Sequence, residues 1–264
     1  MQNEQTKKIA EVKTPMNVFV TINKNYVPKF NVMLYSLLCS NPTEQFNVFV
    51  LHNSLQEEHI EPTRRMLGNR GSVQLVKVDD SGLEKAPTSR RFPKEMYYRI
   101  FAADYLPDTL DRILYLDPDL VVTKSLRSFY DMPFGTALFV ATTHIRSAVH
   151  FLNEVRLGID KTTPYINSGV MLFNLALLRK EQNFADVFAF IHKYKGRLML
   201  PDQDVLSGLY GDRILTVDTF VYNMTEKLFQ HRKQDGEKEN LQYVRDHSAI
   251  VHYCGRNKPW KSNY

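Results

Sequence analysis

Two aspartates separated by one proline, Asp117 and Asp119, follow a short apolar run in this chain of 264 residues. If the backbone stays extended past Leu116, side chains two positions apart point to the same side, with Cα atoms about 6.6 Å apart. Two carboxylates at that spacing suit one hard divalent cation, Mg²⁺ or Mn²⁺ rather than Zn²⁺. Asp-Pro-Asp is also a common solvent-exposed turn, and the tripeptide taken alone favours that simpler interpretation.

A second polar group lies near the C-terminus, where His252, Gly255 and Lys258 follow another short apolar run. Imidazole is a better ligand for Mn²⁺ than for Mg²⁺, so His252 together with the two aspartates favours manganese, with magnesium as the alternative. Gly255 would let the backbone approach a phosphate, and Lys258 would place a positive charge on it. A histidine that ends a strand is more often structural, so this interpretation depends on the aspartates.

The first half of the chain alternates β-rich runs with helical patterns, as in a parallel sheet covered by helices. Helices are predicted after Phe30, after a capping box at Ser54–Glu57 and over residues 95–106. The predicted strands are residues 17–22, 46–51, 72–78 and 112–116. Ligands bind at the carboxyl ends of such strands, and Asp117 stands at one of those ends.

The second half is less regular. Its predicted strands are residues 120–122, 136–141, 166–173, 214–217 and 249–253. We expect one helix over residues 176–194, another beginning near Asp202, and a charged surface loop over residues 230–240. Because no Gly/Ser/Pro linker and no repeat divides the chain, we predict a polar leader at residues 1–15 and a single domain over residues 16–264.

The composition is that of an ordinary globular protein, with 43% hydrophobic and 24% charged residues. No apolar run approaches the roughly 18 residues of a membrane span, and residues 1–15 lack the apolar centre of a signal peptide. Cys39 and Cys254 form no zinc or disulfide pattern, and Cys39 is expected to be a small buried side chain. The net charge of +5 favours anionic partners, but scattered basic residues without an aromatic recognition motif argue against nucleic acid.

Six ordered blocks of sequence lie between Met16 and Trp260: NVFVTINKNY, YYRIFAADYLP, RILYLDPDLVV, INSGVMLFNL, PDQDVLSGL and HYCGRNKPW. Together they resemble glycosyltransferase family 8, which includes bacterial lipopolysaccharide galactosyl- and glucosyltransferases, glycogenins and general stress proteins. The resemblance implies an α/β fold of the GT-A nucleotide-diphospho-sugar transferase type, with a mixed central sheet and a Rossmann-like N-terminal half. It also implies Mn²⁺, a UDP-glucose or UDP-galactose donor, a saccharide or lipopolysaccharide-type acceptor, and transfer with retention of anomeric configuration.

Individual residues receive roles from the same resemblance. Asp117, Asp119 and His252 match the metal ligands. Residues matching the donor-binding positions are Thr21, Ile22, Asn23, Tyr26, Arg99, Asp117, Pro118, Gly255 and Lys258. Asn167, Asp202 and Gln203 match residues around the transferred sugar, whereas Asp204 could instead orient the start of a helix.

The residue types suit glycosyl transfer. Breaking the bond between the sugar and UDP leaves negative charge on the β-phosphate, which a metal and Lys258 would stabilise. A covalent sugar intermediate needs a carboxylate nucleophile, and Gln203 is a neutral amide. We therefore favour attack on the face that UDP leaves, with Gln203 and Asn167 positioning the sugar and Asp202 binding its hydroxyls.

Asn23 and His144 depart from the family pattern, because many relatives carry aspartate at these two positions. These departures leave a non-catalytic UDP-sugar-binding sensor as the alternative function. A metal-dependent phosphoesterase is a weaker alternative, since a second metal would need more acidic ligands. The expected location is cytoplasmic, with at most peripheral contact with the inner membrane face.

Overall fold

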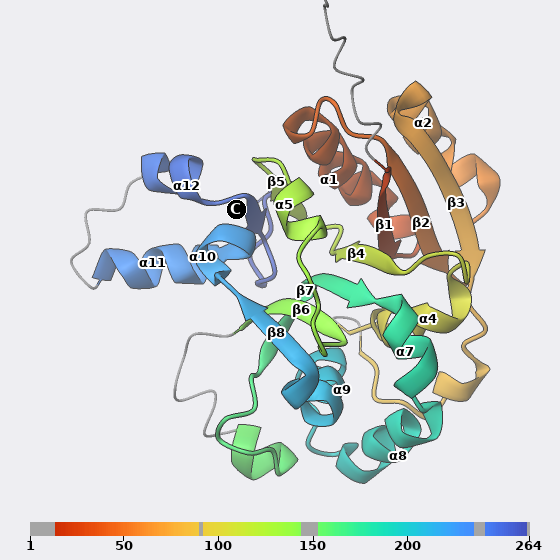
Figure 1. The fold of residues 1–264 in the computed structure, drawn as a ribbon, viewed down its shortest axis with the longest axis vertical. Coiled ribbons are helices and arrows are strands. Elements are labelled where there is room, and N and C mark those ends of the chain that lie inside the picture. Colours follow the sequence, from red (N-terminus) through yellow and green to blue (C-terminus); the bar gives the residue numbers. More distant parts are fainter. Residues whose placement is uncertain (1–13, 90–91, 144–152, 235–240, 263–264) are drawn as a thin grey trace, which may run out of the picture.

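The computed structural model describes residues 14–89, 92–143, 153–234 and 241–262, so most of the predicted polar leader lies outside the described residues. A seven-stranded sheet forms its centre, in the order β3-β2-β1-β4-β7-β6-β8, with helices on both faces (Figure 1). Its strands are β1 (Met16–Thr21), β2 (Phe46–His52), β3 (Gly71–Lys77), β4 (Arg112–Leu116), β6 (Phe139–Thr143), β7 (Ile166–Asn174) and β8 (Ile214–Val217). Among the described residues, no helix combines the length and apolar character needed to cross a membrane.

Strands β3, β2, β1 and β4 are parallel, whereas β7 runs antiparallel to both β4 and β6. The sheet is therefore mixed, with a Rossmann-like parallel half, as predicted. The carboxyl ends of β1 and β4 meet at one edge, because Val18 pairs with Leu114 and Phe19 with Tyr115. This edge brings the loop after Thr21 next to Asp117.

Alternating side chains of the central strands build two apolar layers. Val18 and Val20 of β1 pack with α1 (Val27–Ser40) and α2 (Glu57–Leu67), whereas Phe19 packs on the other face. That other face is covered by α3 (Glu95–Tyr98), α4 (Ala102–Tyr105), α7 (Leu175–Glu181), α8 (Phe184–Tyr194) and α9 (Pro201–Tyr210). This alternation follows from the two-residue period of a strand buried on both faces.

A second sheet has three short strands in the order β5-β10-β9, which are β5 (Leu120–Val122), β10 (Ile250–His252) and β9 (Met224–Thr225). Strand β10 is antiparallel to β5, with His252 opposite Leu120, and parallel to β9. Further α-helices are α5 (Arg127–Tyr130), α10 (Thr219–Tyr222), α11 (Glu226–Gln234) and α12 (Leu241–His247), and residues 153–157 are also helical. The small sheet therefore places His252 of β10 close to Asp119, which directly precedes β5.

Several predicted helices differ in detail. Helix α2 begins at Glu57, and its capping box is formed by Gln56 and His59 rather than by Ser54 and Glu57. The helix predicted over residues 176–194 is divided at residues 182–183, because the side chain of Asn183 accepts from Ala185 N and starts α8 there. The predicted loop over residues 230–240 is helical up to Gln234. Cys39 is exposed, so its predicted burial was wrong.

Candidate active site

A cleft of about 460 Å³ opens where β1 and β4 end. Every residue that the sequence suggested for metal, donor or sugar binding lies in its lining. These residues are Thr21, Ile22, Asn23, Tyr26, Arg99, Asp117, Pro118, Asp119, Asn167, Asp202, Gln203, His252, Gly255 and Lys258. They come from both halves of the chain and from both sheets, so the fold brings together residues that are far apart in sequence.

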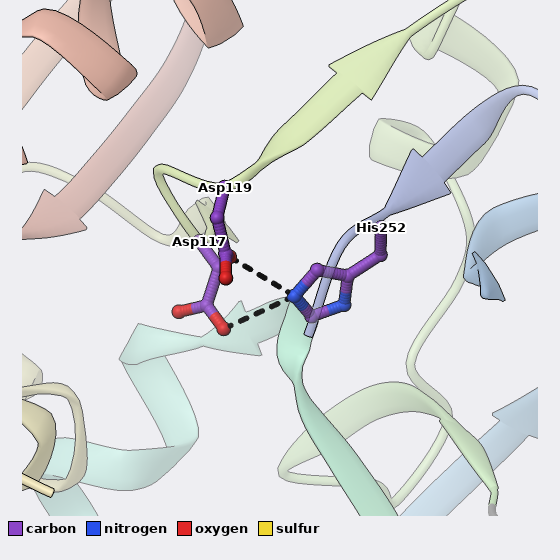
Figure 2. Close-up of side chains that lie close together, drawn as sticks. All are labelled: Asp117, Asp119 and His252. Carbon is purple, nitrogen blue, oxygen red and sulfur yellow. Dashed lines mark hydrogen bonds and ion pairs between the residues drawn. The ribbon is translucent and has the colours of Figure 1, made fainter. Parts of the chain in front are cut away.

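Asp117, Asp119 and His252 form a cluster in this cleft (Figure 2). His252 Nε2 lies 3.1 Å from Asp119 Oδ1 and 3.5 Å from Asp117 Oδ2. One ligand atom from each of the three residues lies within 4.8 Å of the others. Two carboxylate oxygens and one imidazole nitrogen converging on one point fit a divalent cation such as Mn²⁺.

The backbone does not remain extended from Asp117 to Asp119. Strand β4 ends at Leu116, and a turn at residues 118–119 precedes β5. The carboxylates still converge, because Asp117 N donates to Gly169 O at 2.8 Å and Tyr253 N donates to Asp119 O at 3.0 Å. The tripeptide therefore forms the turn rather than the extended backbone, and hydrogen bonds hold this turn to β7 and to the residue after β10.

Arg99 links the two acidic parts of the cleft. Its NH2 lies 3.1 Å from Asp117 Oδ1, and its NH1 lies 3.1 Å from Asp202 Oδ2. The guanidinium also lies over the ring of Tyr115, 4.3 Å from its centroid, and Tyr115 donates a 2.6 Å hydrogen bond to Asp117. Arg99 is 6% exposed, so it is a buried organising cation rather than a surface charge.

The surrounding charges keep both aspartates ionised. Burial alone would raise the pKa of Asp117, but Arg99 and His252 hold it well below its ordinary value. Burial likewise opposes ionisation of Asp119, and His252 lowers its pKa. The pKa of His252 is lowered by burial, but the charge of Asp119 raises it well above the ordinary value. A cation at this point would therefore meet two carboxylates and would displace a proton from the imidazole.

Lys258 and Gly255 belong to the turn after β10. Lys258 contacts the carboxylate of Asp119 and donates to Tyr253 O at 2.6 Å, so its ammonium lies beside the cluster. A Cβ on Gly255 would meet nothing nearer than Asn257 N at 3.9 Å. The packing of the protein itself therefore does not require glycine at position 255.

The loop after β1 forms the opposite wall of the cleft. Thr21 Oγ1 lies 3.3 Å from the hydroxyl of Tyr115, and Ile22 N donates to Leu51 O at 3.2 Å. Asn23 caps the following turn, since its side-chain oxygen accepts from Asn25 N at 3.1 Å. The role of Asn23 in the protein is thus to shape this loop, which also presents Tyr26 to the cleft.

Three polar residues line the cleft from β7 and the start of α9. Asn167 Oδ1 accepts from Gly169 N at 3.0 Å. Asp202 accepts a 2.6 Å hydrogen bond from Ser168 in addition to its ion pair with Arg99, and burial raises its pKa. Gln203 follows it in the first turn of α9. The only carboxylate among these three is therefore already held by two buried partners.

Asp204 stabilises the fold and does not line the cleft. It is fully buried and accepts hydrogen bonds from Met199 N at 2.7 Å and Leu200 N at 3.2 Å, immediately before α9. Arg156 binds both of its carboxylate oxygens at 2.6 Å, and Tyr165 donates to it at 2.7 Å. This confirms the alternative in which Asp204 orients the start of the helix.

Gly169 is a residue of the site that the sequence analysis did not single out. A Cβ at this position would lie 2.2 Å from His252 Cε1 and 2.7 Å from Asp117 Oδ2. Only glycine therefore lets β7 pass beside the cluster. A glycine inside a predicted strand is a signal of such close approach, and residues 166–173 carried it. His144, the other departure from the family pattern, lies outside the described residues.

Comparison with known proteins identifies the family. The sequence profile described as glycosyl transferase family 8 matches residues 17–264. The chain belongs to glycosyl transferase family 8. It is a glycosyltransferase of the GT-A type, as the resemblance of the six blocks implied.

Relatives and solved structures agree with this family. The chain is 28% identical to lipopolysaccharide 1,2-glucosyltransferase of Escherichia coli over 92% of its own length and 73% of that protein. It is 26% identical to general stress protein A of Bacillus subtilis (strain 168), covering 94% and 88%. The crystal structure of galactosyltransferase LgtC in complex with donor and acceptor sugar analogues has a TM-score of 0.81 at 23% identity, covering 94% of this chain and 90% of that one. At 23% identity, the similarity to the LgtC structure supports only the assignment of the fold.

Proposed function

We propose that this glycosyltransferase moves glucose or galactose from a UDP-sugar to a hydroxyl of a saccharide or lipopolysaccharide-type acceptor. The proposal includes Mn²⁺ as the metal, Mg²⁺ as its substitute, and retention of anomeric configuration. It also includes action in the cytoplasm, with at most peripheral contact with the inner membrane. The single observation that carries it is the Asp117, Asp119 and His252 cluster in a cleft beside Lys258 and Arg99.

The three clustered residues would hold the metal, which when bound supplies a positive charge for the diphosphate of UDP. The ammonium group of Lys258 would lie beside the β-phosphate, where negative charge develops as the bond between the sugar and UDP breaks. Arg99 keeps Asp117 ionised and fixed, since it pairs with that carboxylate and with Asp202. Thr21, Ile22, Asn23 and Tyr26 would bind uracil and ribose on the opposite wall, with Pro118 and Gly255 lining the path between.

Retention by attack on the face that UDP leaves is supported by the state of Asp202. Arg99 and Ser168 both bind Oδ2 of Asp202, which fixes this carboxylate and offsets part of its charge, so it is a poorer nucleophile than a free carboxylate. We therefore propose that Gln203 and Asn167 position the sugar and that Asp202 binds its hydroxyls.

The deciding experiment combines donor binding with turnover. Thermal shifts are measured with UDP-, GDP- and ADP-sugars, with and without Mn²⁺, and UDP release is then followed across an acceptor panel. We expect stabilisation by UDP-glucose or UDP-galactose only with Mn²⁺, and metal-dependent UDP release that Asp119→Ala abolishes. Asp108→Asn is the matched control, because the Asp108 side chain is 96% exposed. Absence of a UDP preference would refute the donor, and binding without turnover would favour the sensor.

A further inference from the structure

Asn223 lies directly behind His252, on the side away from the two aspartates. Its Oδ1 is 2.8 Å from His252 Nδ1, while His252 Nε2 faces Asp119 and Asp117. Asn223 follows α10 and precedes β9, which pairs with β10, so the small sheet brings the two side chains together. Both residues are at most 1% exposed, and water cannot replace this contact.

The chemistry of the contact determines where the imidazole carries its proton. An amide oxygen only accepts hydrogen bonds, so His252 Nδ1 must be the donor. Asn223 is itself oriented, because its Nδ2 donates to Thr142 Oγ1 at 2.8 Å, and Thr142 is fully buried in β6. With the proton held on Nδ1, the neutral ring presents the lone pair of Nε2 to the carboxylates.

We infer that Asn223 is a positioning residue for the metal site, with Thr142 behind it. Asn223 selects the tautomer of His252 that can bind a cation through Nε2 and fixes the plane of its ring. Partners of this kind behind metal-binding histidines typically change metal affinity by about 10- to 100-fold when removed. The part of the inference that concerns metal affinity rests on the proposed function, whereas the tautomer does not.

The tautomer is read from the ¹⁵N chemical shifts of the two ring nitrogens in histidine-labelled, metal-free protein, at a pH where the ring is neutral. His252→Gln identifies the signals. We expect the proton on Nδ1 in the wild type and in Asn223→Asp, whose carboxylate still accepts from Nδ1. In Asn223→Leu we expect it on Nε2, facing Asp119. A wild-type proton on Nε2 would overturn the inference, and this measurement needs no variant that might lose its fold.

Mn²⁺ affinity is measured in parallel by electron paramagnetic resonance, with UDP present. We expect Asn223→Leu to weaken binding by about 10- to 100-fold and Asn223→Asp to restore most of it. Thr219→Val is the control, since Thr219 lies in α10 and its hydroxyl donates to Thr143 O in β6 rather than to the pair of Asn223 and His252. A folded Asn223→Leu with wild-type affinity would overturn the inference. If the wild type keeps the Nδ1 proton but binds no Mn²⁺, the proposed metal fails and the tautomer assignment stands.

Discussion

The ammonium of Lys258 contacts Oδ2 of Asp119, so a cation proposed to bind the donor is paired with a carboxylate proposed to bind the metal. Both groups are largely buried, with side-chain exposures of 15% and 11%. A metal bound as proposed would therefore compete with Lys258 for one carboxylate, and the diphosphate of the donor would offer Lys258 another anion.

This competition predicts opposite effects of Lys258→Met on two ligands. Loss of the ammonium removes a competitor, so Mn²⁺ alone should bind at least as tightly as to the wild type. Binding of UDP should weaken by about tenfold or more, and turnover should fall by about 10²- to 10³-fold, because developing phosphate charge loses its partner. Calorimetric titration with Mn²⁺ and with UDP tests both effects, with Lys180→Met on α7 as the control. Parallel losses of both affinities would contradict the competition.

Gly169→Ala should damage the metal site by steric overlap. The new Cβ would overlap the His252 ring and the Asp117 carboxylate, so both must move. We expect Mn²⁺ affinity to fall by more than about tenfold and the free energy of unfolding to fall by about 1–3 kcal/mol, as in other overpacked sites. Gly196→Ala has open space around its Cβ and should change neither quantity. Metal titration and urea unfolding measure the two effects, and wild-type metal affinity in Gly169→Ala would refute the close approach.

Metal affinity should rise with pH. Asp119 raises the pKa of His252, while Asp117 and Asp119 have lowered pKa values and stay ionised near neutrality. Binding must therefore displace one proton from His252, so Mn²⁺ affinity should increase by up to about tenfold per pH unit between pH 6 and pH 8.

The raised pKa of His252 has the opposite effect on the stability of the metal-free protein, which should fall as the pH rises. A histidine whose pKa is raised by folding stabilises the protein fully below its unfolded pKa of about 6.5, and this contribution is lost as the pH rises through the folded value. Metal titrations and urea midpoints measured at pH 6, 7 and 8 test both slopes. His252→Gln should lack both, and a variant that retained them would show that another group titrates.

Arg156→Met should destabilise the protein strongly. Arg156 is the partner of the fully buried Asp204, whose remaining hydrogen bonds come from Tyr165 and two backbone N–H groups. Breaking a buried pair from one side typically costs about 3–5 kcal/mol, and the remaining donors favour the lower end. Urea unfolding measures the loss. Arg213→Met, which removes an ion pair with Glu181 at side-chain exposures of 32% and 37% and a hydrogen bond to Thr136 O, should lower the urea midpoint much less. Equal midpoints for the two variants would contradict this assignment.

The parallel half of the sheet could be predicted because its signals are local. The apolar run at residues 17–22 and the helical spacing from Phe30 to Leu38 each define one element within a few positions. Cys39 lies just beyond Leu38 on the same helix but off its apolar stripe, which explains why it is exposed. Insertion of β7 between β4 and β6, and pairing of β10 with β5, depend on residues far apart in sequence, for which periodicity carries no signal.

The residues of the site also fall into two groups, those that the sequence reveals and those that only the structure reveals. Chemical type and ordered motifs identified Asp117, Asp119 and His252, because carboxylates and imidazole at strand ends are recognisable in a sequence. Gly169 and Asn223 have no such chemistry of their own. Their positions follow from what β7 and the small sheet bring within a few ångströms of His252, which only the three-dimensional arrangement provides.

The pairing of β10 with β5 also determines when the Asp117, Asp119 and His252 cluster can form during synthesis of the chain. His252 follows Asp119 by 133 residues, and β5 has no antiparallel partner until β10 has emerged. A nascent chain that has not yet been extended to His252 therefore has both aspartates without the imidazole that completes the cluster. If this cluster binds the proposed metal, translation products that stop before His252 should not bind it, and metal binding should begin when β10 docks on β5.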